Sequence, residues 1–375
     1  MENKNRKLVL HFDARNTVFL ADKCYRLTIE KALNTYLSGL VWGETALTEE
    51  EKESLSNEIR LLPDDWSCSE ESPCLRSPFP GAKSVYKILE KHLVHIPSDR
   101  GKLRERLGHF TQTPEGLIFA DLYSNHLNML VWPKEASVSD VAAERFTVKG
   151  EDGVRYHYVL PAFLKLITYL AEQYQGEFMV LIRTYGKDGP YILRAISSFL
   201  QGLHPCVRAP LINVPSIDHR PLKLKRVLGA PFYTYTNEDG EVLAQDARTI
   251  YQLWNDSSVG IIGVVDDFNF WHEQNYDYSA AKPLWFDPED MEHQHILFDD
   301  NIRFEDDGSN VVNVQELQKD SNLARSLSPE DALSFENIFY VQADLLKIIS
   351  DTDYFVNQVQ NCVKNFNNKF VNPSA

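Results

Sequence analysis

The chain lacks a hydrophobic run long enough to cross a membrane, and its polar start, MENKNRK, is followed by no apolar signal core. A membrane-spanning helix needs about 20 predominantly apolar residues, and a secretory signal needs an apolar core. Only five cysteines are present, and their spacing fits neither a disulfide framework nor a zinc site. The sequence therefore predicts a cytoplasmic protein that has no membrane partner.

Basic residues are also scarce, since 38 Lys and Arg stand against 54 Asp and Glu, a formal net charge of −16. Nucleic acids are bound by clusters of Lys and Arg, so the sequence predicts no nucleic-acid partner. A phosphorylated substrate is compatible with this charge, because a bound divalent cation can reverse the local field. The 375 residues suffice for two domains, or for one domain with a large insertion, and leave the oligomeric state open.

Apolar segments typical of buried strands alternate with amphipathic segments typical of helices. FMVLIRT at 178–184 predicts a strand, and YHYVLPAFLKLITYLAEQYQG before it predicts a helix. FYTYTNEDGEVLA at 232–244 predicts a hairpin around an Asp-Gly turn, and TEEE at 48–51 predicts a helix start. Strands that alternate with helices predict an α/β fold with a mainly parallel sheet.

In such a sheet, ligands bind outside the carboxyl ends of the strands, so the residues that follow each apolar run matter most. These positions carry carboxylates and hydroxyls: Asp13 with Thr17, Thr184, Asp266 with Asp267, and Asp299 with Asp300. Oxygen ligands of this kind suit Mg²⁺. A carboxylate beside a cation stays ionised and can attack phosphorus, and a lysine can neutralise the oxygens of the transferred group.

LHFDARNTV, MVLIRT and HILFDDN stand in the order and approximate spacing of three motifs of the haloacid dehalogenase-like (HAD-like) superfamily, which the chain resembles over 8–18 and roughly 156–314. The first motif is an apolar strand followed by Asp-x-Asp-x-Thr. The second is an apolar strand that ends in Thr or Ser, the third is a Lys or Arg, and the fourth is an apolar strand that ends in paired acids.

The resemblance implies a Rossmann-like parallel sheet flanked by helices, with a large, mainly helical cap inserted after the first strand. The expected ranges are 1–20 and 155–350 for the α/β core, 21–154 for the cap, and 351–375 for a helical or frayed C-terminal tail. It also implies Mg²⁺-dependent hydrolysis of a phosphate ester, through an aspartyl-phosphate, with a phosphorylated small molecule or a phosphoprotein as substrate.

Residue by residue, the resemblance implies one role for each motif position. Asp13 is the expected nucleophile and a Mg²⁺ ligand, and Asp299 and Asp300 are the expected further Mg²⁺ ligands. Thr184 is the expected phosphate-binding hydroxyl, and Thr17 supports the turn after the first strand. Lys282 is the candidate for the third motif because it shortly precedes the strand that ends in the paired acids, and Lys187 and Arg303 are the alternatives.

Arg15 departs from the family pattern, because phosphatases of the family carry there a second Asp that acts as general acid and base. An arginine stays protonated and cannot do this. Arg15 either binds the phosphate of the substrate or pairs with Asp13 and silences the site. The alternative function is therefore a catalytically inactive HAD-like binding or scaffold protein. A phosphotransferase, or a phosphatase that acts on a protein or a lipid head group, is a third possibility.

Two further groups of residues have simpler interpretations. Asp266 and Asp267 also follow an apolar strand and are interpreted as a rim loop, with contact to the metal or the substrate as the alternative. His293 and His295 have a spacing that suits a metal but are interpreted as ordinary surface or packing residues.

Overall fold

The computed structural model describes residues 6–21, 23–24, 27–44, 66–134, 136, 140–175, 177–227, 233–304, 310–319 and 321–372. The chain divides into two compact units: Met1–Phe19 with Pro133–Thr147 and Tyr158–Ala375, and Leu20–Trp132 with Val148–His157. The expected insertion at 21–154 differs from this division chiefly at Pro133–Thr147, which belong to the first unit. The helix start predicted at 48–51 lies outside the described residues.

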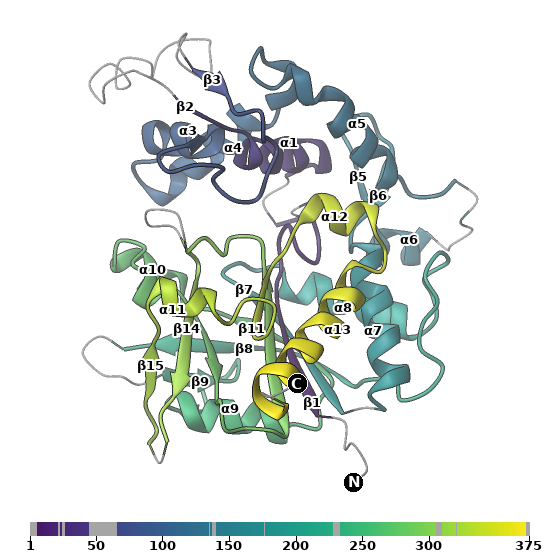
Figure 1. Cartoon of the computed structure of the whole chain (residues 1–375). Coiled ribbons are helices and arrows are strands. Elements are labelled where there is room, and N and C mark those ends of the chain that lie inside the picture. The colour runs from purple at the N-terminus through teal and green to yellow at the C-terminus, as the bar shows by residue number, and fades with distance from the viewer. Residues whose placement is uncertain are drawn as a thin grey trace. The chain divides into compact units, whose positions relative to one another are not determined.

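The first unit contains a mostly parallel sheet in the order β10-β9-β8-β11-β7-β1-β13-β16 (Figure 1). Its strands are β1 (Lys7–Asp13), β7 (Phe178–Thr184), β8 (Ile217–Arg226), β9 (Tyr233–Thr236), β10 (Val242–Gln245), β11 (Ile261–Val265), β13 (His293–Asp299) and β16 (Tyr340–Gln342). Neighbouring strands pair in parallel from β8 through β11, β7, β1 and β13 to β16. Strands β9 and β10 form the predicted antiparallel hairpin, and β9 also pairs antiparallel with β8. The α/β prediction with a mainly parallel sheet is therefore confirmed.

The order of the strands places a topological switch point beside β1. From β1 the chain adds β7 to β11 on one side, with β11 next to β7, and it later adds β13 and β16 on the other side. Ligands of open α/β sheets bind at such a point, outside the carboxyl ends of the strands. The switch point between β1 and β13 is therefore the place where a site is expected.

A second, smaller sheet in the order β12-β14-β15 belongs to the same unit. Its strands are β12 (Lys282–Phe286), β14 (Val312–Leu317) and β15 (Ala324–Ser326). Trp285 of β12 and Leu317 of β14 share a buried cluster with Val9 of β1. The small sheet thus packs on one face of the large one.

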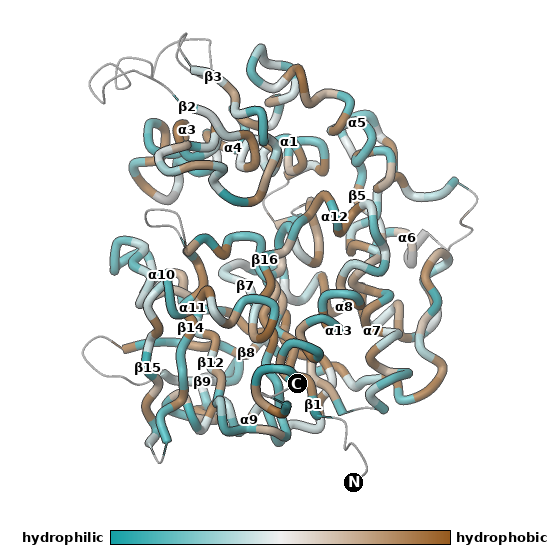
Figure 2. Tube along the Cα trace, in the orientation of Figure 1, coloured by the Kyte–Doolittle hydropathy of each residue, from teal (hydrophilic) through white to brown (hydrophobic). Residues whose placement is uncertain are grey.

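Side chains along β1 point alternately to the two faces of the large sheet, and this determines which of them face the small sheet. Val9 lies in the cluster with Trp285, and because successive side chains of a strand point to opposite faces, His11 and Asp13 share its face. Phe12 points the other way and packs against Phe163 and Phe355 at ring-centroid distances of 5.0 and 5.2 Å. Figure 2 shows hydrophobic residues along the strands of this unit, and the residues of β1 and β7 are buried along almost the whole length of both strands.

The helices of the first unit begin where the sequence supplies suitable first residues. Pro161 opens one of them at a position that needs no backbone N–H, and Asp246 caps another by accepting from the Thr249 backbone. They are α6 (Asp140–Phe146), α7 (Pro161–Gln173), α8 (Gly189–Leu200), α9 (Ala247–Asp256), α10 (Phe268–Glu273), α11 (Pro329–Leu333), α12 (Leu345–Ser350) and α13 (Tyr354–Phe366). None of the described helices combines the length and the apolar character that a membrane crossing requires.

The second unit is mainly helical in its described part. Its helices are α1 (Ile29–Leu40), α3 (Val85–Leu93), α4 (Arg100–Leu107) and α5 (Ala120–Met129), and its short strands are β2 (Trp42–Glu44), β3 (Ser67–Cys68), β4 (Lys83–Ser84) and β6 (Arg155–His157). Strand β6 pairs with β5 (Thr147–Lys149), whose first residue belongs to the first unit. Asn34 of α1 accepts from the backbone and the hydroxyl of Thr111 at 2.8 Å each, which ties two segments of this unit together.

Candidate functional site

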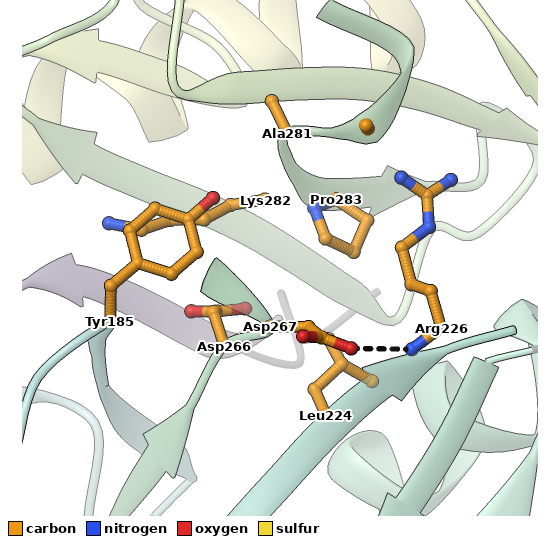
Figure 3. Close-up of a pocket in the computed structure, with 9 residues that line it drawn as sticks. Tyr185, Leu224, Arg226, Asp266, Asp267, Ala281, Lys282 and Pro283 are labelled. Atoms are coloured by element: carbon orange, nitrogen blue, oxygen red, sulfur yellow. Dashed lines mark hydrogen bonds between the residues drawn. The ribbon is translucent and has the colours of Figure 1, made fainter. Parts of the chain in front are cut away.

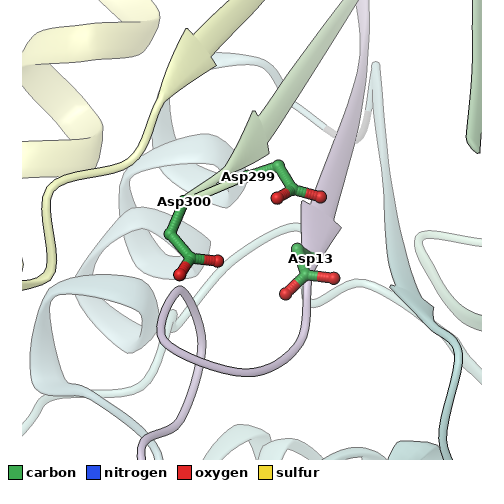
Figure 4. Close-up of side chains that lie close together, drawn as sticks. All are labelled: Asp13, Asp299 and Asp300. Carbon is green, nitrogen blue, oxygen red and sulfur yellow. The ribbon is translucent and has the colours of Figure 1, made fainter. Parts of the chain in front are cut away.

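Three carboxylates converge at the switch point between β1 and β13. Asp13 ends β1, Asp299 ends β13, and Asp300 follows it. Phe12 pairs with Phe298 in the sheet, so the two strands end at the same level. Each of the three side chains offers an oxygen within 4.8 Å of the others (Figure 4). The group has only oxygen ligands, which fits a hard cation such as Mg²⁺ better than a soft metal.

Lys282 lies against this acidic group. Its ammonium donates hydrogen bonds to Asp13 and, at 3.0 Å, to Oδ2 of Asp299. Lys282 is the first residue of β12, so the small sheet carries it to the end of β1 although 269 residues separate it from Asp13. Of the two alternatives, Lys187 is exposed. Arg303 lies near Asp300, because burial and Asp299 raise the pKa of Asp300 and Arg303 opposes this rise.

The charges of this group do not balance. Three carboxylates against the one ammonium that contacts them leave two negative charges within this group when all four are ionised, with Arg303 as a further cation near Asp300. Burial raises the pKa of Asp13, and the other two carboxylates raise it further, while Lys282 opposes the rise. Burial opposes the charge of Lys282, yet Asp13 and Asp299 outweigh it and raise the pKa of the ammonium. Buried charges need a partner or neutralisation, and a divalent cation would supply the missing two charges.

The turn after β1 holds one of the acids in place. Asn16 has a φ of 60°, a left-handed conformation that asparagine tolerates better than most residues. Its Nδ2 donates to Oδ2 of Asp300 at 2.9 Å. Thr17 is fully buried beneath the turn. Arg15 forms no ion pair with Asp13, although both residues are described, so the structure does not have the silencing contact that the sequence left open.

Thr184 ends β7 next to this group. Asp13 pairs with Arg183 in the sheet, which puts Thr184 one position beyond Asp13 along the same edge. The Thr184 hydroxyl accepts from the backbone N–H of Gly186 at 2.8 Å. A hydroxyl has one proton to donate besides its two lone pairs. The proton of Thr184 therefore stays free to bind an oxygen of a ligand.

The second acidic strand end has a different environment. Asp266 is buried, and Arg183 binds it with two guanidinium nitrogens, one of them, Nε, at 3.1 Å. Arg183 also donates to the carbonyl of Pro283 at 2.6 Å. Asp266 and Asp267 lie in the loop between β11 and α10 and line a pocket there, while Asp266 is buried and its charge is matched by an arginine inside the fold. That arginine was visible in the sequence as a charged residue within an apolar strand, FMVLIRT.

A small pocket lies at the end of β11, beside the start of β12 (Figure 3). Its lining includes Tyr185, Arg226, Asp266, Asp267 and Lys282. The enclosed space suits about one water molecule. Tyr185, which directly follows Thr184, was missed in the sequence, because no pattern there distinguishes it from a core aromatic.

The histidines on the strands have structural partners. His295 of β13 bonds His11 of β1 at 3.0 Å and Asn255 of α9 at 2.8 Å, inside the sheet–helix core. His293 faces Asp290 at 3.0 Å. Their interpretation as packing residues agrees with these contacts, and neither belongs to the acidic group that could hold a metal.

Comparisons with protein-family models, with curated proteins and with solved structures found no match. The arrangement of Asp13, Thr184, Lys282, Asp299 and Asp300 therefore carries the functional argument by itself. This arrangement unites an unbalanced acidic group, a buried lysine and a hydroxyl proton at the carboxyl edge of a parallel sheet.

Proposed function

We propose that the chain is a HAD-like phosphatase that hydrolyses a phosphate ester through an aspartyl-phosphate on Asp13. The observation that carries the proposal is the contact of Lys282 with both Asp13 and Asp299 beside a third buried carboxylate. The Rossmann-like core with an inserted cap belongs to the same proposal. The mostly parallel sheet and the separate, mainly helical unit that follows β1 support it.

Asp13, Asp299 and Asp300 are the residues that would hold Mg²⁺. The bound cation would neutralise the acids and the phosphoryl oxygens, so that two anionic groups can approach each other. The Asn16 amide, by donating to Asp300, fixes the orientation of one of these ligands.

The transfer step needs a positioned nucleophile and stabilised oxygens. Asp13 attacks phosphorus with a carboxylate oxygen, a P–O bond forms, and the bond to the leaving group breaks. The ammonium of Lys282 orients Asp13 and neutralises charge on the transferred group, and the Thr184 hydroxyl donates to one of its oxygens. Water then attacks the aspartyl-phosphate and releases phosphate.

Arg15 determines how fast the two proton-dependent steps proceed. It can neither protonate the leaving group nor take a proton from the attacking water. General acid–base catalysis contributes roughly 10² to 10⁴ in rate. We therefore expect good leaving groups to be transferred fastest, and the aspartyl-phosphate to accumulate because its hydrolysis has no general base at this position.

The test is a panel of phosphate esters with and without Mg²⁺, read as released phosphate. Turnover is expected with an aryl phosphate and Mg²⁺, and Asp13→Asn should abolish it. Asp246→Asn is the matched control, because Asp246 caps α9 and asparagine caps helices equally well. Full turnover in Asp13→Asn would overturn the assigned nucleophile.

The second candidate is an inactive HAD-like binding protein, which Arg15 alone favours. Such a protein would bind Mg²⁺ and a phosphorylated ligand without releasing phosphate. It would also stay inactive after Arg15→Asp, since its lack of turnover would not stem from that residue alone.

A further inference from the structure

We infer that Tyr185 is a phosphoryl-binding residue, whose hydroxyl donates a hydrogen bond to an oxygen of the phosphate group that Lys282 neutralises. This inference deepens the proposed function and rests on it for the identity of the ligand. Tyr185 belongs neither to the sequence motifs nor to the acidic group, so the inference gives this side chain a role of its own.

The first observation is that the Tyr185 hydroxyl is shielded from solvent and has no hydrogen-bond partner among the described residues. A buried hydroxyl without a partner destabilises a fold, and a ligand atom that bonds the hydroxyl would remove this cost. The structure offers the partner position directly, because the pocket that Tyr185 lines is also lined by Lys282 (Figure 3).

The second observation is that the ring is held rigidly. Tyr185 stacks on Trp271 of α10 with an interplanar angle of 6° and a centroid distance of 5.5 Å. Phe268 packs edge-on against it at 5.7 Å. A donor that is fixed in advance loses little entropy when it binds, which is the arrangement expected of a binding group.

The third observation is the position of the charges around the ring. The ammonium of Lys282 lies 5.0 Å from the centre of the Tyr185 ring. Asp266 beside it is already matched by Arg183, so it does not compete for the hydroxyl proton. Burial raises the pKa of Tyr185, which keeps the hydroxyl a neutral donor at physiological pH.

These features select an anionic oxygen as the ligand atom. The pocket has room for about one oxygen-sized atom, and its lining includes the phenol of Tyr185 and the cationic side chains of Lys282 and Arg226. The two carboxylates in the lining have other partners, since Asp266 pairs with Arg183 and Asp267 accepts from the start of α10. Thr184, the residue before Tyr185, has its own hydroxyl proton at the same sheet edge. Consecutive residues 184 and 185 thus each carry a hydroxyl at the end of β7, and that of Tyr185 belongs to a side chain that lines the pocket with Lys282.

The experiment measures binding of inorganic phosphate by calorimetry to the full chain in saturating Mg²⁺, for wild type, Tyr185→Phe and Tyr169→Phe. Tyr169 is the matched control, since its hydroxyl accepts from Gln360 and it lines neither the pocket nor the acidic group. We expect Tyr185→Phe to weaken phosphate binding about ten-fold or more, because a hydrogen bond to a charged group is lost. The affinity of Tyr185→Phe for Mg²⁺ should equal that of wild type. The affinity of Tyr169→Phe for phosphate should also equal that of wild type.

If Tyr185 had only a structural role, its substitution would change the melting temperature rather than the phosphate affinity. Tyr185→Phe removes an unpartnered hydroxyl, so the melting temperature of the phosphate-free protein should stay equal or rise. A lower melting temperature with unchanged phosphate affinity would show a packing role and overturn the inference.

Turnover separates this inference from the proposed function. If wild type hydrolyses phosphate esters and Tyr185→Phe binds phosphate like wild type, the inference alone fails. If wild type shows no turnover but phosphate binding weakens in Tyr185→Phe, the inference holds and the phosphatase proposal fails. Wild type that binds no phosphate in the presence of Mg²⁺ overturns the inference.

Discussion

Two strands of the same sheet, β11 and β13, end in a pair of aspartates, and the two pairs have opposite environments. At the end of β11, Asp266 is buried against Arg183, and Asp267 caps α10 by accepting from the Phe270 backbone at 3.1 Å. At the end of β13, Asp299 and Asp300 lie with Asp13 against one lysine. At the end of β11, the first aspartate of the pair thus forms an ion pair with Arg183. At the end of β13, both aspartates belong to a group that has more negative than positive charge.

The two aspartate pairs differ in charge balance rather than in the acidic motif itself. A buried carboxylate matched by a guanidinium needs nothing more from solution. A buried group with two surplus negative charges needs protons or a cation. The four predictions that follow test this contrast, beginning with the largest effect.

Breaking the ion pair of Asp266 and Arg183 should have the largest effect on stability. Arg183→Met leaves the carboxylate of Asp266 buried without a partner, and we expect the free energy of unfolding to fall by about 3–5 kcal/mol. Denaturant unfolding measures it. The double variant Arg183→Met/Asp266→Leu removes both charges and should recover most of the loss. Unchanged stability in the single variant would contradict the structural role of the pair.

The unbalanced group should respond to divalent cations. Mg²⁺ at about 100 times its Kd should stabilise wild type by about 2.7 kcal/mol over the protein in chelator. Asp299→Asn should lose most of this stabilisation because a ligand and a negative charge disappear, whereas Asp246→Asn should keep it. Thermal or denaturant unfolding with and without Mg²⁺ gives the result, and equal stabilisation of Asp299→Asn would exclude the acidic group as the binding site.

The strands that end in the unbalanced acids also carry buried neutral histidines. Burial lowers the pKa of His295 to about 3, and burial, with His295 nearby, lowers the pKa of His11 well below its usual value. Their stabilisation is fully present above about pH 6.5, the unfolded pKa, and each histidine should cost about 1.4 kcal/mol per pH unit below it.

Unfolding of wild type and of His11→Leu/His295→Leu between pH 7.5 and 5.5 would measure this effect. The double variant should show the flatter dependence, since two sites that take up protons on unfolding are gone. An equally steep fall in both proteins would assign the acid sensitivity to other groups.

The smallest effect concerns Arg15, which separates the chain from the pattern of family phosphatases. Arg15→Asp supplies a group able to donate and accept a proton, so hydrolysis of an alkyl phosphate should rise about ten-fold or more. Aryl phosphates, whose leaving groups need little protonation, should gain less in the transfer step. If both esters gain equally, Asp at position 15 accelerates hydrolysis of the aspartyl-phosphate rather than the transfer step. If neither ester gains, the inactive binding protein is favoured.

The sequence predicts the α/β architecture well, because strand and helix periodicities are local. It also indicates Asp13, Thr184 and Asp299, since each directly follows an apolar strand and parallel strands end at one edge. The position of Lys282 depends on a second sheet, which packs only after distant segments meet. Its contact with Asp13 therefore follows from tertiary packing rather than from a local pattern.

The ion pair of Asp266 and the environment of Tyr185 were not predicted, for the same physical reason. Whether Asp266 is matched depends on the register of β11 against β7, where Val264 pairs with Arg183. Whether the Tyr185 hydroxyl has a partner depends on α10 and β12, which come later in the chain. Motifs identify which residues reach the edge of the sheet, and long-range packing determines the charges around them.

The most direct test of the central claim is mass spectrometry of the Asp13 peptide after wild type is mixed with an aryl phosphate and Mg²⁺ and quenched in acid. Because Arg15 cannot activate the hydrolytic water, the account predicts one phosphoryl group on Asp13 and an initial burst of released alcohol. Both should be absent in Asp13→Asn and in chelator. Phosphate release without any phosphoryl group on Asp13, or equal turnover in Asp13→Asn, would contradict the account.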